Sequence, residues 1–215
     1  WELLRFFMSF NFNHLSEPDS IAVMGILNLS PNSFYSKSYF SHIDDVLKYV
    51  EKLIEEGVNI LDIGAESTRP GSKKISVDLE LERLIPVISI LAKKYKIPIS
   101  VDTYKPEVAS AVLQEGANVI NDISGLSSGS AMAKVISRHS AGIVLMHMKG
   151  TPETMQENPC YDNVCSEVLE FLRQKIELAI DAGVDSKSIA IDPGIGFGKT
   201  LNHNLILISN LAKFK

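Results

Sequence analysis

The sequence predicts an α/β protein built as a TIM (β/α)8 barrel, with only about six β/α units present in this chain. Short apolar segments alternate with amphipathic helical patterns, and this alternation is typical of a parallel sheet. Polar residues recur at the C-terminal end of nearly every apolar segment. All strand ends of a barrel open on one mouth, whereas an open doubly wound sheet gathers its ligand groups at one switch point, so the pattern favours the barrel.

Six apolar runs have the length and composition of buried parallel strands. They span residues 21–27, 60–63, 97–101, 119–121, 142–146 and 188–192. The residues expected at their ends are Asn28, the loop after Asp62, Asp102, Asn121, His147 and Asp192. Two further units would be needed to close an eight-stranded barrel, so we expect the first and sixth strands to leave unpaired edges and an exposed inner face.

Two helices are clearest from their 3.6-residue apolar period. The first lies between Ser41, a candidate N-cap, and Gly57, a candidate stop. Its apolar stripe is Ile43, Val46, Leu47, Val50, Leu53 and Ile54. The second carries its stripe from Val164 to Ala179 and stops at Gly183. Further helices are expected near 78–95, 105–115, 131–138 and 203–214.

Length and composition indicate one globular domain. The 215 residues are 45% hydrophobic and 22% charged, which suits a single sizeable core. We expect residues 1–17 to form an N-terminal extension or linker and residues 18–215 to form the barrel domain. The net charge of −5, without a basic run, argues against a nucleic-acid partner. No apolar run approaches the ~18 residues that span a bilayer.

The N-terminal segment and the two cysteines predict a cytoplasmic protein. The opening "WELLRFFMSF" carries Glu2 and Arg5 and lacks the small-residue cleavage site of a secretion signal. Cys160 and Cys165 are the only cysteines, so a zinc site lacks ligands at suitable spacing. We therefore expect free thiols.

The glycine-rich stretch "IDPGIGFGKT" resembles a nucleotide loop but fails both register tests. A P-loop needs glycine where Pro193 stands, and a dinucleotide fingerprint needs glycine where Lys199 stands. What is left is an apolar run that ends in Asp192 and a flexible turn. A buried parallel strand delivers a carboxylate to the mouth of a barrel in this way.

Three strand-end residues predict a binding site for a planar heterocycle. Asp102, Asn121 and Asp192 end three strands of one proposed barrel, so they can converge. A carboxylate accepts from an amino group and an adjacent ring N–H, while a carboxamide both donates and accepts. Each residue alone could instead be a helix cap or a turn residue, but three at matching strand ends favour a site.

Other candidates are weaker. The loop "ESTRPGS" after the second strand holds Arg69, which is suited to a carboxylate or phosphate. Asn28 could offer its oxygen to a hard cation or its amide to a phosphate. His147 has no evident acid or histidine partner, so we interpret it as structural, and Met146 as an apolar wall.

Five segments together resemble the successive signatures of the dihydropteroate synthase family. They are "VMGILNLSPNSF", "DIGAESTRPGS", "VDTYKPEVASAVLQEGANVINDISG", "LMHMKGTPETMQ" and "IDPGIGFGKT", in the order of that family and over most of residues 21–205. The resemblance implies a TIM barrel that condenses 6-hydroxymethyl-7,8-dihydropterin diphosphate with p-aminobenzoate in folate biosynthesis. It also implies inhibition by sulfonamides at the aminobenzoate pocket, Mg²⁺ as cofactor, and a homodimer.

The resemblance also implies roles for residues of this chain. The pterin-binding residues would be Thr68, Asp102, Asn121, Met146, Asp192, Gly196 and Phe197, and the aminobenzoate-binding residues would be Thr68, Arg69, Pro70 and Phe197. Asn28, Thr68 and Arg69 would be catalytic, with Asn28 at the Mg²⁺. The family chemistry is dissociative: the C–O bond to diphosphate breaks first, and the arylamine then captures a pterin cation.

The chain departs from the family pattern at several places. Asn32 stands where the family usually has aspartate, Ala65 replaces a frequent glycine, and the family's Ser-x-Lys and Arg-x-His motifs have no counterpart. Those two motifs contact the pterin and the diphosphate in the family. Two alternatives therefore stay open: a non-catalytic pterin-binding module, and a pterin-dependent methyltransferase.

Overall fold

The computed structural model describes residues 9–15, 20–29, 39–69 and 71–215. Its centre is one parallel sheet of six strands in sequential order. The strands are β1 (Met24–Asn28), β2 (Ile60–Gly64), β3 (Ile99–Asp102), β4 (Val119–Asp122), β5 (Gly142–Met146) and β6 (Ile189–Asp192). All six predicted strands are confirmed, and their ends differ from the predicted ends by three residues at most.

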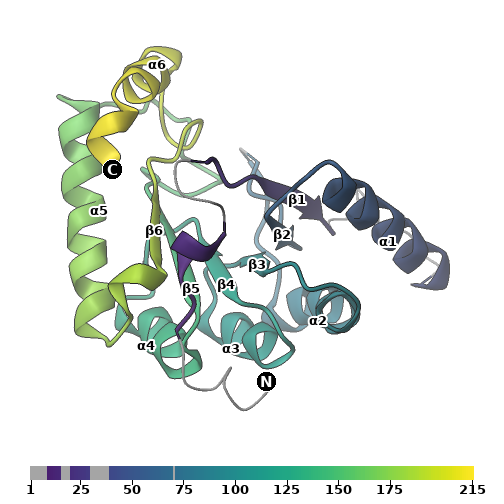
Figure 1. The fold of residues 1–215 in the computed structure, drawn as a ribbon. Coiled ribbons are helices and arrows are strands. Elements are labelled where there is room, and N and C mark those ends of the chain that lie inside the picture. Colours follow the sequence, from purple (N-terminus) through teal and green to yellow (C-terminus); the bar gives the residue numbers. More distant parts are fainter. Residues whose placement is uncertain (1–8, 16–19, 30–38, 70) are drawn as a thin grey trace.

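A helix follows every strand and lies on the outside of the curved sheet (Figure 1). The helices are α1 (Tyr39–Glu55), α2 (Val77–Lys94), α3 (Pro106–Gln114), α4 (Ser130–His139), α5 (Val164–Asp181) and α6 (Leu201–Ser209). Strands that pair in chain order, each linked to the next by an outer helix, form the wall of a (β/α) barrel rather than a doubly wound sheet. The predicted fold class is confirmed as a partial barrel of six units.

Two details at helix ends differ from the prediction. Ser41 lies inside α1, which begins at Tyr39, so the predicted N-cap is wrong. The last predicted helix is divided: α6 ends at Ser209, and a separate 3-10 turn covers Leu211–Phe214. The stop at Gly57 is confirmed, because this glycine has φ +90° and its N–H donates to the carbonyl oxygen of Ile54.

The strands bury one face against the helices and turn the other toward the barrel interior. Leu27, Leu61 and Val101 point outward and are fully buried under the helix layer. On the inner face of β1, Ile26 is 59% exposed. Within the described structure β1 and β6 each pair on one side only. The expected open edges and exposed inner face are therefore present.

Part of the predicted N-terminal extension packs on the base of the barrel. The Phe10 N–H donates to the carbonyl oxygen of Ser140, just before β5, and the hydroxyl of Ser188, just before β6, donates to the carbonyl oxygen of Phe10. The Phe10 ring lies against Gly142 at the start of β5. Residues 9–15 thus cover the end of the sheet opposite the strand-end residues. None of the described helices is long and apolar enough to cross a membrane.

Candidate active site

The C-terminal ends of β1 to β4 carry one continuous row of site residues. Strand register pairs Asn28 with Gly64, Gly64 with Asp102, and Asp102 with Asn121. Residues that pair across parallel strands point to the same face of the sheet. The three side chains of this row therefore share the inner face, as the sequence predicted for Asp102 and Asn121.

β6 places the carboxylate of Asp192 on the same inner face, two residues further toward the mouth than Asn121. Asn121 pairs with Val144, Val144 pairs with Ala190, and two residues further along, Met146 pairs with Asp192. Because side chains alternate with a period of two, Asp192 and Met146 lie on the face that holds Asn121. Met146 is buried at 2% exposure, and its role as an apolar wall stays a prediction.

Gly64 leaves room for two of these side chains. A Cβ placed on Gly64 would lie 3.3 Å from Oδ1 of Asn28 and 3.5 Å from Oδ2 of Asp102. The carboxamide and the carboxylate therefore both border the space above Gly64. The missing side chain at Gly64 is part of the hollow that they line.

Asp62 is a site residue that the sequence analysis missed. It lies on the inner face of β2 at 7% exposure, and its Oδ2 accepts a hydrogen bond of 3.0 Å from Nδ2 of Asn121. Burial raises its pKa, against the hydrogen bond from Asn121. Oδ1 of Asn121 is buried without a hydrogen-bond partner in the described structure. The available signal was an acid inside the apolar run "ILDIG".

Asp102 is a half-buried carboxylate that forms no ion pair within the described residues. Its pKa is raised well above the usual range, first by burial and then by the negative charges of Asp62, Glu80, Asp122 and Glu66. The row is therefore electronegative and deficient in hydrogen-bond donors. A ligand with several N–H groups would supply what these oxygens lack.

The carboxylate of Glu66 holds the loop after β2 in place through three hydrogen bonds. Its Oε2 accepts from the Ile75 N–H at 2.9 Å and from Lys105 at 2.7 Å, while Oε1 accepts from the Tyr104 hydroxyl at 2.8 Å. Lys105 also pairs with Glu80, which is only 1% exposed. Burial would raise the pKa of Glu66, but these hydrogen bonds outweigh it and lower the pKa.

Within that loop, Thr68 is half-buried and Arg69 is exposed. The Ser72 N–H donates to the carbonyl oxygen of Arg69, and the Gly71 N–H donates to that of Pro152 in the loop after β5. These contacts place the Arg69 segment at the mouth, beside the loop of a distant strand. Pro70 and Asn32 lie outside the described residues.

The glycine-rich stretch after β6 packs on the loop after β5. Oδ1 of Asp192 accepts the Gly194 N–H at 2.7 Å. A Cβ on Gly194 would lie 1.9 Å from the carbonyl oxygen of His147, and one on Gly198 would lie 2.5 Å from that of Lys149. Both glycines have positive φ, +69° and +63°. Close backbone contact, and not a phosphate, therefore accounts for these two glycines.

Lys199 lies beneath this stretch at 3% exposure, and the sequence analysis gave it no role. Its ammonium contacts the carbonyl oxygen of Phe197 at 2.8 Å, that of His147 at 3.2 Å, and Nδ1 of His147 at 3.0 Å. Burial lowers the pKa of Lys199 to about 8, against the nearby Asp192. Burial and the charge of Lys199 lower the pKa of His147 to about 4. Phe197 is half-buried and Gly196 is exposed at the mouth.

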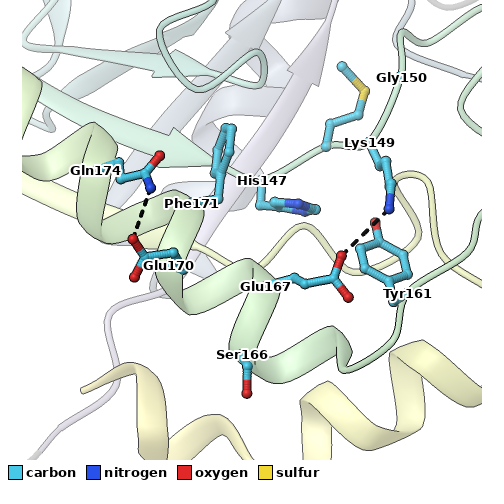
Figure 2. Close-up of a pocket in the computed structure, with 10 residues that line it drawn as sticks. His147, Lys149, Gly150, Tyr161, Ser166, Glu167, Glu170, Phe171 and Gln174 are labelled. Carbon is cyan, nitrogen blue, oxygen red and sulfur yellow. Dashed lines mark hydrogen bonds and ion pairs between the residues drawn. The ribbon is translucent and has the colours of Figure 1, made fainter.

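On its outer side, His147 borders a separate cavity of about 610 Å³ between the loop after β5 and α5. Figure 2 shows its ring between Phe171 and Tyr161, above the Lys149–Glu167 ion pair. The ring centroids of His147 and Phe171 are 4.9 Å apart in an edge-to-face arrangement. Apart from His147, none of the predicted strand-end residues lines this cavity.

The predicted free thiols are confirmed. Cys160 and Cys165 are both free, the first exposed and the second buried. No group of three or more His, Cys, Asp or Glu residues in the described ranges could hold a metal ion by itself.

Comparisons with known proteins agree with this geometry. A model of the pterin binding enzyme family matches residues 24–215. The dihydropteroate synthase of Escherichia coli K12 is 43% identical over 192 residues, which cover 89% of this chain and 68% of that protein. The enzyme of Bacillus subtilis is 42% identical over 200 residues, covering 93% and 68%.

Solved structures of dihydropteroate synthases also resemble this chain. The Yersinia pestis dihydropteroate synthase in a sulfonamide complex superposes with a TM-score of 0.83 at 37% identity, covering 93% of this chain and 71% of that one. The Burkholderia cenocepacia enzyme complexed with 7,8-dihydropteroate gives 0.80 at 39% identity, covering 92% and 67%. The chain belongs to the dihydropteroate synthase family of pterin-binding enzymes.

Proposed function

We propose that the inner-face row binds the pterin ring of 6-hydroxymethyl-7,8-dihydropterin diphosphate, and that p-aminobenzoate displaces the diphosphate at the same mouth to give 7,8-dihydropteroate. The observation that carries this proposal is a shared deficit of donors. Asp102 has no cation partner among the described residues, and the neighbouring Oδ1 of Asn121 is buried without a donor. The amino group and ring N–H groups of a pterin would supply those donors.

The pterin would lie flat against the inner face. Asp102 and Asn121 accept from its N–H groups, while Asp192 approaches from β6. Asp62 acts behind Asn121, because its hydrogen bond fixes which way the carboxamide points. Met146 offers the apolar wall on which the ring packs. Thr68, Gly196 and Phe197 would close the remaining sides.

The diphosphate would leave on the side of Asn28. Asn28 is exposed, and its carboxamide oxygen borders the space above Gly64, which gives the mouth one neutral oxygen ligand beside the carboxylates. This fits Mg²⁺, which takes few protein oxygens and completes its shell with water and phosphate. When bound, the ion would neutralise charge on the departing diphosphate.

The electronegative row supports a dissociative reaction. The C–O bond breaks with its electron pair going to the diphosphate, and positive charge develops on the pterin methylene. The side-chain oxygens of Asp62 and Asp102, in a site that already holds several acids, would stabilise that cation. The nitrogen lone pair of p-aminobenzoate then forms the C–N bond, and the nitrogen releases a proton to water.

The aminobenzoate would bind between the loops that follow β2 and β6. The exposed guanidinium of Arg69 is suited to its carboxylate, and Thr68, Pro70 and Phe197 would flank the ring. Sulfonamides, which share the aryl amine, would compete here. A homodimer and a cytoplasmic location belong to the same proposal; light scattering and cell fractionation test them.

A two-part assay tests the function. Calorimetry measures binding of 6-hydroxymethylpterin, and chromatography follows 7,8-dihydropteroate and diphosphate with p-aminobenzoate and Mg²⁺ present. We expect binding, product formation and loss of turnover with a chelator. Pterin binding without product would support the non-catalytic module instead, and methyl transfer from a reduced methylfolate would support the methyltransferase.

A further inference from the structure

We propose that Lys199 is a positioning residue that fixes the Phe197 wall of the aminobenzoate pocket, an inference that rests on the function proposed above. Its buried ammonium ties the glycine-rich loop after β6 to the carboxyl end of β5. No role in substrate contact is needed, because Lys199 acts through the backbone that carries Phe197.

The contacts of Lys199 are with neutral acceptors of two loops. One acceptor, the carbonyl oxygen of Phe197, belongs to the loop after β6, and the other two belong to His147 at the end of β5. Among the described residues no carboxylate lies within ion-pair distance of Lys199. Burying an ammonium is costly, so its three directed contacts have to hold the backbone in one arrangement.

The protonation states give the direction of these hydrogen bonds. With a pKa of about 8, Lys199 is mostly protonated at neutral pH and donates. With a pKa of about 4, His147 is neutral, so its Nδ1 accepts and its proton is on Nε2. All three N–H bonds of the ammonium therefore have an acceptor.

The surrounding loop makes Phe197 sensitive to this link. The Phe197 N–H donates to the carbonyl oxygen of Gly194, and its own carbonyl oxygen accepts from Lys199. Gly194 and Gly198, on either side, approach the loop after β5 so closely that neither position has room for a Cβ. Without the ammonium, the carbonyl oxygen of Phe197 would lose its donor, and the hydrogen bond of 2.8 Å from the Tyr161 hydroxyl to the Gly198 carbonyl oxygen would be left to hold the next residue.

The test compares three variants of the protein. Lys199→Met removes the charge and keeps most of the side-chain length. Lys199→Arg keeps the charge but replaces the compact ammonium by a planar guanidinium group. Lys187→Met is the control, at an exposed lysine before β6. The measurements are pterin affinity, the KM for p-aminobenzoate, and amide hydrogen exchange over residues 194–199.

We expect Lys199→Met to raise the KM for p-aminobenzoate about tenfold, with pterin affinity within about twofold and exchange at residues 197–199 about tenfold faster. Lys199→Arg should show a smaller rise in the same KM, and Lys187→Met none. A merely structural lysine would lower the melting temperature without separating the two substrates.

Three outcomes decide between the proposals. An unchanged KM for p-aminobenzoate together with unchanged exchange in Lys199→Met overturns the positioning role while the proposed function stands. If Lys199→Met does not fold, a folded Lys199→Arg with the wild-type KM overturns it equally. If the wild-type protein itself shows neither pterin binding nor turnover, the proposed function fails, and the exchange data alone decide whether Lys199 holds the loop.

Discussion

Two clusters of buried acids lie side by side at the carboxyl ends of β2 and β3, and they balance their charges in opposite ways. In the first, Glu66 and Glu80 share the ammonium of Lys105. In the second, Asp62 and Asp102 form no ion pair among the described residues. We call the first the loop clamp (Glu66, Glu80, Lys105) and the second the acidic row (Asp62, Asp102).

The two clusters differ in whether their carboxylates have a cation partner among the described residues: those of the loop clamp do, and those of the acidic row do not. Partners in the clamp lower the pKa of Glu66, whereas burial and neighbouring charges raise the pKa of Asp102. The clamp even adds to this effect, because Glu80 and Glu66 are among the charges that raise the pKa of Asp102. Strongly perturbed pKa values cluster at functional sites, which supports the ligand-binding role proposed for the acidic row.

The largest effect is expected from Lys105→Met. Removing the shared cation leaves two buried carboxylates unpaired, and breaking a buried pair in this way costs about 3–5 kcal/mol. Urea unfolding measures it. The control is Lys52→Met, which removes an exposed pair with Glu56 at 3.7 Å and should change the free energy of unfolding by about 0–1 kcal/mol. A loss in Lys105→Met no larger than in the control would show that the clamp is not structural.

Asp102→Asn should separate binding from stability. We expect pterin affinity to fall by roughly 1–3 kcal/mol, the range for spoiling a charge-assisted hydrogen bond. The free energy of unfolding at pH 7 should not fall, because the substitution removes a charge that folding disfavours. Calorimetry and urea unfolding measure the two quantities, with Asp45→Asn on the exposed side of α1 as control. Unchanged affinity would exclude Asp102 from the pocket.

Gly64→Ala tests the hollow beside the acidic row. The added methyl group would lie 3.3 Å from Oδ1 of Asn28 and 3.5 Å from Oδ2 of Asp102, so affinity for the pterin diphosphate should fall by about 1 kcal/mol. Gly25→Ala is the matched control, since its methyl group would meet Val58 and Leu53 in the core under α1. The control should lower stability and leave affinity unchanged. Equal affinities for both variants would place the ligand away from β2.

Much of the fold could be predicted from the sequence because it depends on local patterns. The run "GIVLM" of β5 was predicted with its observed bounds. The Ser41 cap is wrong because α1 begins at Tyr39, two residues before Ser41. The positions of Asp102 and Asn121 at strand ends also predict that they lie close together, because parallel strands bring their carboxyl ends to one edge of the sheet.

The residues that the sequence analysis missed act through contacts between distant segments. Lys105 meets Glu66 across 39 positions, and Lys199 meets His147 across 52. No local period marks such pairs. His147 was interpreted as structural because no acid or histidine partner was evident, and its actual partner is a lysine. Register also revealed Asp62, whose alternation with apolar neighbours placed it on the inner face.

The smallest effect, and the one that distinguishes the clusters most directly, is the pH dependence of stability. A lowered pKa, as in Glu66, contributes stability that is present above the ordinary value of 4.5 and is lost as pH falls through the folded value. Glu66→Gln should therefore be less stable than wild type at pH 7, with a deficit that closes below pH 4.5. A raised pKa, as in Asp102, costs stability as pH rises above 3.8. Asp102→Asn should thus show an advantage at pH 7 that shrinks on acidification and is gone below pH 3.8. Urea unfolding between pH 3 and 7 measures both differences, and differences of the same sign would mean that the two clusters are not electrostatically distinct.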